Sequence, residues 1–165
     1  MPLRWEAMTL RAGPGSAAHE RRFGADIMGV FTAELRRYKT SKGFLAQAKR
    51  LEPGAPLSSG EWRRLQSQCD KMLAITPDAF LIAYSSVRGV RFISARAVTD
   101  YIGRDAFDLY DIGVMFFFEK HFESFIGDSR LDKPDIRTLE NLYIEVPADE
   151  RPSAHVLQVI VREAE

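Results

Sequence analysis

The chain has 165 residues and no net charge, because 23 Lys and Arg residues balance 23 Asp and Glu residues. Hydrophobic residues make up 45% of it and charged residues 28%, close to ordinary globular composition. No apolar run reaches the roughly 18 residues of a membrane span, and the first 15 residues lack the apolar centre of a signal peptide. We therefore expect one globular domain without a membrane partner.

The chain has one cysteine, Cys69, which cannot form an internal disulfide. We expect it to be a small buried apolar side chain. A reducing, cytoplasmic location is the simplest interpretation.

Charge is unevenly distributed along the chain. Residues 1–99 hold 16 Lys and Arg against 8 Asp and Glu, whereas residues 100–150 hold 5 against 13. Either the basic part meets a polyanion, or the two parts face each other or are simply solvated.

In chain order, GPGSA at 13–17 is a breaker, and Ser16 can cap a short helix running to Arg22. Residues 25–31 then read as a strand. The polar, basic stretch 32–42 suits a continuing strand, a turn and a loop. Residues 43–49 read as a second, mostly buried strand.

The clearest helix comes next. Ser58 and Glu61 have capping-box spacing. One apolar stripe follows on the same helix, formed by Trp62, Leu65, Cys69, Met72 and Leu73. Pro77 ends it, and residues 80–84 and 90–94 read as strands joined by a turn. This order of helices and strands is typical of an α/β sandwich.

The acidic part begins near Asp100. Residues 114–126 predict an amphipathic core helix ended by Gly127, with one buried face formed by Val114, Phe117, Phe118, Phe122 and Phe125. Pro134 is expected to start another helix, to about Leu142, and residues 155–161 read as a last strand. We expect a single domain over 1–165, with a core at about 16–95 and an elaboration at about 100–165.

The candidate chemistry lies at the end of the strand at 43–49. Side chains alternate along a strand, so Gln47 and Lys49 share one face. A lysine there costs free energy unless its ammonium reaches water or an anion. Asp26, Gln47 and the Ala48 carbonyl offer the oxygen ligands that Mg²⁺ prefers. A lysine beside such an ion can hold the attacking water.

Gly24-Ala25-Asp26 followed about twenty residues later by Gln47-Ala48-Lys49-Arg50 resembles the PD-(D/E)XK nuclease superfamily. The glutamine variant is similar to Mrr-like restriction endonucleases. The resemblance covers about residues 16–95. It implies a restriction-endonuclease-like α/β sandwich, whose core is a helix, three antiparallel strands, a second helix and a further strand forming a mixed sheet flanked by helices. Residues 100–165 would then be a C-terminal elaboration of helices and a strand.

The resemblance also implies residue roles. Asp26 would bind Mg²⁺ or Mn²⁺, with Gln47 and the Ala48 carbonyl as further ligands, and Lys49 would position the water. Glu20, on the first helix, would contact the metal or a metal-bound water. Phosphate contacts near the site would come from Arg36, Arg37, Lys39, Lys42 and Arg50.

Three functions remain open. The first is a metal-dependent endonuclease that hydrolyses double-stranded DNA in restriction, defence or repair, as a homodimer or with a partner that supplies target recognition. The second is an inactive domain of the same fold that binds nucleic acid or protein. The third is an unrelated α/β domain in which the motif is a coincidence.

Overall fold

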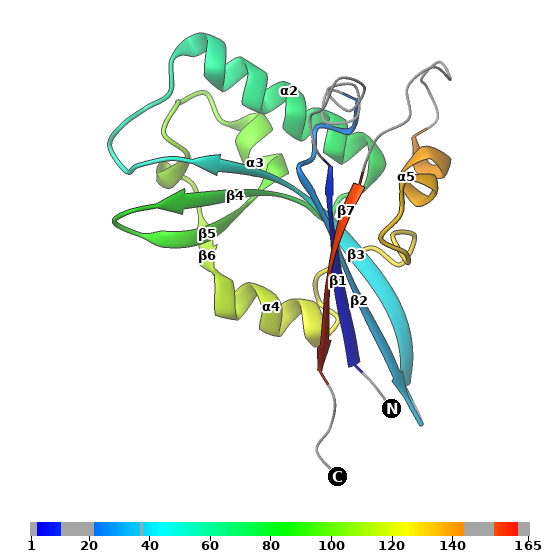
Figure 1. The fold of residues 1–165 in the computed structure, drawn as a ribbon. Helices are drawn as coiled ribbons and strands as arrows, with labels where there is room; N and C mark the ends of the chain where they lie inside the picture. Colours follow the sequence, from blue (N-terminus) through cyan, green and yellow to red (C-terminus); the bar gives the residue numbers. More distant parts are fainter. Residues whose placement is uncertain (1–2, 11–21, 37, 144–153, 162–165) are drawn as a thin grey trace.

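The computed structural model describes residues 3–10, 22–36, 38–143 and 154–161 (Figure 1). Its elements are β1 (Leu3–Leu10), β2 (Ile27–Leu35), β3 (Tyr38–Arg50), α2 (Ser59–Ile75), β4 (Ala79–Ser85), β5 (Gly89–Ser94), α3 (Ala95–Asp100), a 3₁₀ turn (Ala106–Asp108), β6 (Asp111–Gly113), α4 (Val114–Phe122), α5 (Ile136–Leu142) and β7 (Ala154–Val161). None of the described helices has the length and hydropathy needed to cross a membrane.

All seven described strands form one mixed sheet in the order β6-β5-β4-β3-β2-β1-β7. Strands β1, β2 and β3 form an antiparallel meander. Helix α2 then carries the chain across to β4, which pairs parallel to β3. Strands β5 and β6 extend one edge, and β7 pairs with β1 at the other. The chain therefore has the expected α/β fold.

Helices cover both faces of the sheet (Figure 1). Helices α2, α3 and α5 share the larger apolar core with one face, represented by Leu65, Val98 and Leu139. On the opposite face α4 contributes Phe117 to a smaller cluster with Phe44.

The start of α2 is as the sequence predicts. The Glu61 amide donates to Ser58 Oγ at 3.3 Å, and the Ser58 amide donates to Glu61 Oε2 at 3.2 Å. Both halves of the capping box are therefore formed. The buried stripe comprises Trp62, Leu65, Cys69, Met72 and Ile75.

Four elements were not expected from the sequence: β1, α3, the 3₁₀ turn and β6. Strand β1 is half-polar, with Arg4 and Glu6 in it, and pairs on both edges, with β2 and with β7. These long-range partners lie far from β1 along the sequence. The first described element is therefore a strand, whereas the resemblance implies a helix first.

The prediction of a loop within residues 32–42 is wrong, because most of this stretch lies in two strands. Strand β2 continues to Leu35, Arg36 is in a turn, and β3 already begins at Tyr38. The polar side chains remain in strands because they pair across the hairpin, as Thr32 Oγ1 and Ser41 Oγ do at 3.0 Å.

The helix expected at 114–126 is shorter than predicted and buries a different face. Helix α4 ends at Phe122, and Ser124 adopts a positive φ of 74°. Phe117 is buried, but Phe122 and Phe125 are exposed. A nine-residue helix on a sheet buries one narrow stripe, so the remaining aromatic residues face outward.

The next helix begins two residues later than predicted, at Ile136 instead of Pro134. Asp135 sets this start, because its Oδ1 accepts a hydrogen bond of 2.7 Å from the Thr138 amide.

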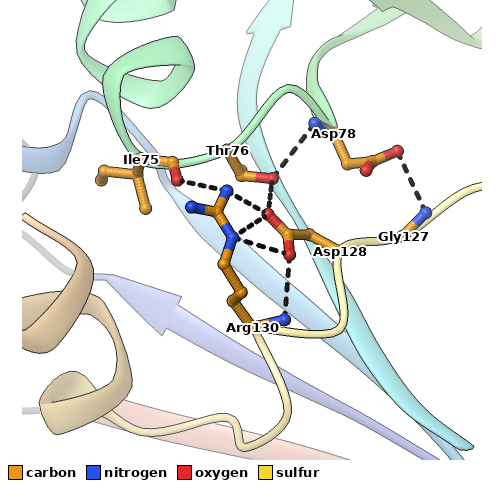
Figure 2. A network of polar contacts seen from close by, with 6 residues as sticks. All are labelled: Ile75, Thr76, Asp78, Gly127, Asp128 and Arg130. Atoms are coloured by element: carbon orange, nitrogen blue, oxygen red, sulfur yellow. Dashed lines mark hydrogen bonds and ion pairs between the residues drawn. The ribbon is translucent and has the colours of Figure 1, made fainter.

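Residues 127–132, which we call the segment after α4, are held by polar contacts against the turn between α2 and β4 (Figure 2). Asp128 accepts hydrogen bonds from Thr76 Oγ1 at 2.8 Å and from the Arg130 guanidinium, and Arg130 also donates to the Ile75 carbonyl at 3.1 Å. The Gly127 amide donates to Asp78 at 3.0 Å. The segment therefore lies against the end of α2 and the start of β4.

Candidate functional site

The candidate site lies where β2 begins and β3 ends. Asp26 directly precedes β2, and its main chain extends the sheet on both sides: its amide donates to the Ala46 carbonyl at 2.9 Å, and its carbonyl accepts from the Leu10 amide at 2.7 Å. Three adjacent strands therefore fix the position of Asp26.

The Asp26 carboxylate contacts the Gln-x-Lys motif directly. Asp26 Oδ2 accepts a hydrogen bond of 2.9 Å from the Ala48 amide and a further bond from Gln47 Nε2. The structure thus brings Asp26 and Gln47 together across about twenty residues of sequence.

The Gln47 side chain has one atom without a partner. Gln47 is 6% exposed, and its Oε1 is buried without a hydrogen bond among the described residues. Its Nε2 makes only a long contact of 3.4 Å to the Ala48 carbonyl besides the bond to Asp26. Buried polar atoms are nearly always satisfied in folded proteins, so this oxygen is available as a ligand atom. The amide nitrogen of Gln47, and not this oxygen, faces the Asp26 carboxylate and the Ala48 carbonyl.

Gly24 explains how the chain reaches this position. It has a φ of +72°, and a Cβ at this residue would lie 2.1 Å from the Gln68 carbonyl oxygen of α2. Only glycine fits so close an approach with this backbone conformation. The glycine of the Gly-x-Asp motif therefore lets the chain pass against α2 before Asp26.

The residues just before Gly24 are held by the C-terminal part of the chain. Phe23 is buried and packs edge-on against Tyr143, and Arg22 lies 3.5 Å from Glu140 of α5. Sequence reasoning missed this support, because nothing in residues 136–143 indicates a partner near residue 22.

Lys49 follows Gln47 on the same face of β3. That face carries Leu45, which belongs to the core shared with α2. Hydrogen bonds from Ser58, together with the charges of Lys49 and Arg64, lower the pKa of Glu61. The Lys49 ammonium therefore lies in the neighbourhood of the first turn of α2.

The predicted phosphate contacts do not gather at this site. Arg50 is exposed next to Lys49 and lies 3.8 Å from Glu52. Arg36 and Lys39 are exposed at the opposite end of the β2–β3 hairpin, about 30 Å along the strand at 3.3 Å per residue. This corrects the expectation that these side chains surround the site, because the hairpin is longer than the sequence indicated.

Lys42 is a clearer correction. It is 5% exposed, and a Cβ on Gly127 would touch its side chain and His121. Burial lowers the pKa of Lys42, while Tyr38 and Asp78 oppose that shift. Lys42 therefore lies beneath the segment after α4 instead of on a phosphate-binding surface.

Glu20 and Arg37 lie outside the described residues. Position 20 falls between β1 and β2 in the chain. Within the described ranges no group of three or more His, Cys, Asp or Glu side chains is arranged to hold a metal.

The remaining donors fit a hard cation in composition. They are one carboxylate from Asp26, the unpartnered amide oxygen of Gln47 and the main-chain carbonyl of Ala48. Mg²⁺ takes oxygen ligands, keeps several waters and commonly uses only one or two carboxylates plus substrate phosphates.

The sequence also contains no signal that points to Glu52, which follows β3 and stabilises the adjoining turn between β4 and β5. Its carboxylate accepts hydrogen bonds from the Ser86 amide at 3.0 Å and from the Ser85 hydroxyl at 2.7 Å. Bonds from the Ser86 amide and the two serine hydroxyls lower the pKa of Glu52 to about 2. Glu52 therefore stays ionised and fastens the β4–β5 turn to the end of β3.

Comparison with models of known protein families gives no match, and neither a curated protein nor a solved structure is significantly similar to the chain.

Proposed function

We propose that the chain is a metal-dependent endonuclease that hydrolyses phosphodiester bonds in double-stranded DNA. The observation that carries the proposal is the contact between Asp26 and Gln47, with an unpartnered buried oxygen on Gln47. Leaving the Gln47 oxygen buried and unpaired costs about 1–3 kcal/mol, which formation of the strands does not require.

The sheet order supports a restriction-endonuclease-like fold. The antiparallel strands β2 and β3, the crossover helix α2 and the parallel strand β4 follow the order that the resemblance implies after its first helix. The third antiparallel strand, β1, instead precedes residues 16–22 in the chain. Asp26, directly before β2, and Gln47 in β3 lie side by side, as the nuclease proposal requires and as a coincidental motif does not.

Asp26, Gln47 Oε1 and the Ala48 carbonyl would hold Mg²⁺ or Mn²⁺. A bound ion of this kind lowers the pKa of water and offsets charge on a phosphate in the transition state. Lys49 would orient the attacking water and screen the developing charge. Arg50, exposed at the end of the same strand, would contact a phosphate of the substrate.

The test is plasmid cleavage with Mg²⁺ or Mn²⁺ by the wild type, Asp26→Asn and Lys49→Ala. Asp26→Asn keeps the side-chain shape and an acceptor for the Ala48 amide. We expect each substitution to reduce cleavage more than about 100-fold. Lys39→Ala is the matched control, because it removes an exposed lysine from the far end of the same strand and should leave cleavage unchanged.

Gln47→Glu adds a reciprocal test. A carboxylate in place of the amide adds a negative charge to the donor set, so Mn²⁺ should bind more tightly by calorimetry. Wild type that neither cuts DNA nor binds Mn²⁺, with folding intact by circular dichroism, would refute the nuclease proposal. DNA binding that remains in that case would favour the inactive binding domain.

A further inference from the structure

Helix α4 exposes apolar side chains on the side that faces away from the sheet. Met115 is 81% exposed, Phe125 just after the helix is 78% exposed, and Phe116 and Phe122 are 47% and 45% exposed. Phe117 and His121 fill the buried side. Although α4 also carries Glu119 and Lys120, exposed apolar side chains of this size gathered in one place are unusual on a monomer. Figure 1 shows α4 at the outside of the molecule.

We name the four exposed apolar side chains of α4 and of the residues just after it the α4 patch: Met115, Phe116, Phe122 and Phe125. The Lys120 ammonium joins two of them, since it lies 5.3 Å from the ring centre of Phe116 and 5.5 Å from that of Phe125. Phe122 packs on Phe31 of the sheet, with ring centres 5.0 Å apart, and this contact holds the Phe122 side of the α4 patch in place.

The Lys120 ammonium within the α4 patch is already paired, with two carboxylates that together exceed its charge by one. Lys120 Nζ lies 2.6 Å from Glu123 and 3.4 Å from Glu119. Covering the patch with an apolar surface therefore leaves no lysine buried without a partner, provided that the Glu119 carboxylate, 55% exposed in the monomer, stays in water at the rim of the contact. The chemistry of the patch suits an apolar protein surface.

The size of the patch indicates what kind of contact it can make. At about 200 Å² for a fully exposed side chain of this size, the four exposed fractions amount to roughly 500 Å². That is near the upper end for the largest apolar patch of a monomer. Two such patches face to face bury roughly 1,000 Å², the lower limit for a specific interface.

We infer that the α4 patch is the contact surface of a symmetric homodimer, in which α4 of one copy packs against α4 of a second. Elsewhere the described residues expose apolar side chains singly or in smaller groups, such as Ile102 alone and Val87 with the cross-strand pair Tyr84 and Val90 on the β4–β5 hairpin. The best match on a second copy is therefore the α4 patch itself. A contact between identical patches also closes after two copies, whereas contacts between different patches generate rings or filaments.

The inference does not depend on nuclease activity, because the patch lies on the sheet face opposite Gln47 and Lys49. It is tested without metal or DNA, by sedimentation equilibrium of the full chain over a wide range of protein concentration. We expect the mass to rise from the 18.7 kDa monomer to twice that value.

The test variant is Met115→Glu combined with Phe125→Glu. Both positions are exposed in the monomer, so the fold should survive, which circular dichroism checks. Since each substitution occurs on both sides of a symmetric contact, the dimer dissociation constant should rise more than about 100-fold. Ile102→Glu, an equally exposed apolar position on the α2–α3 side, is the control and should change nothing.

A wild type that remains monomeric at every concentration would overturn the inference. So would a dimer that survives the double substitution, since another surface, such as the β7 side of the sheet, would then hold the copies together.

Discussion

At the scale of single residues, glycines with the same backbone conformation have different roles. Gly24 and Gly54 have φ values of +72° and +73°. A Cβ on Gly24 would meet the Gln68 carbonyl, whereas a Cβ on Gly54 would have nothing within 4 Å. The pair separates the cost of backbone strain from the cost of close packing.

We predict that Gly54→Ala lowers the free energy of unfolding by about 1 kcal/mol, the cost of a left-handed conformation. Gly24→Ala should lower it by about 3 kcal/mol or more, because main-chain atoms must also move apart. Urea unfolding measures both values. Equal losses at the two positions would mean that the approach of Gly24 to α2 is not tight.

His121 is a second residue whose environment could not be read from the sequence. It is fully buried among aromatic rings, and its Nδ1 lies 2.9 Å from the Ile126 carbonyl. Burial lowers the pKa of His121 to about 4; the bond to Ile126 opposes this shift, and the charge of Lys42 adds to it. The histidine is therefore neutral in the folded protein at pH 7.

This predicts a loss of stability in acid. Between pH 6.5 and pH 4 the unfolded chain binds a proton at His121 that the folded chain does not, so the free energy of unfolding falls as pH falls. By pH 5 this loss should reach about 2 kcal/mol. Urea unfolding at pH 7 and pH 5 measures it, and His121→Phe should remove that part of the pH dependence.

Asp78 and Lys42 stay in place in that variant, so the difference between the two proteins isolates His121. Burial raises the pKa of Asp78, which acts on acid stability in the opposite direction in both proteins. An unchanged pH dependence in His121→Phe would contradict the prediction.

At the scale of elements, the segment after α4 is held by its own contacts more than by its secondary structure. Two main-chain hydrogen bonds join Gly43 and Asp128, at 3.0 Å and 2.7 Å. Burial acts to raise the pKa of the Asp128 carboxyl, but the hydrogen bonds from Arg130 and Thr76 outweigh burial and the pKa is lowered. The ionised carboxylate of Asp128 is thus the centre of the network in Figure 2.

We predict that Asp128→Asn lowers the free energy of unfolding by about 1–2 kcal/mol, since the ion pair is half-exposed on the arginine side. Hydrogen exchange of the Gly127 and Gly43 amides should accelerate, because both are bonded within this network. Asp132→Asn, an exposed acid of the same segment, is the control. Protection that stays the same in Asp128→Asn would show that the main chain alone holds the segment.

The elements also show which sequence signals are reliable. The capping box and apolar stripe of α2 are local, and the helix formed as expected from Ser58 onward. Strand β3 was predicted over 43–49 and extends to Tyr38, because its polar half is stabilised by pairing with β2. Helix α4 kept its start at Val114 but exposes Phe122 and Phe125.

At the scale of the whole molecule, the uneven charge of the sequence is partly balanced in space. Three ion pairs join arginines of the basic part to acids of residues 100–150: Arg22 with Glu140, and Arg88 and Arg91 with Asp111. Part of the basic charge is therefore neutralised within the chain, which leaves less of it to attract a polyanion.

The sheet itself joins distant parts of the chain. Strand β1 lies between β2 and the C-terminal β7, and the acidic part supplies β6 at the opposite edge. Such pairing depends on which strands meet after collapse, and no local pattern at residues 3–10 indicates it. This explains why β1 was missed while the hairpin and the crossover around α2 were anticipated.

By itself the sequence determined the α/β class, the α2 helix with its cap, and the candidate pair Asp26 and Gln47, because caps, periodicity and short motifs act over a few residues. Only the tertiary structure decided that Gly24 presses on α2, that Lys42 and His121 are buried, and that α4 turns aromatic side chains outward. These outcomes depend on segments that meet from far apart in the chain. The burial of Lys42 and His121, and the lowered pKa of each, follow from the packing of these distant segments.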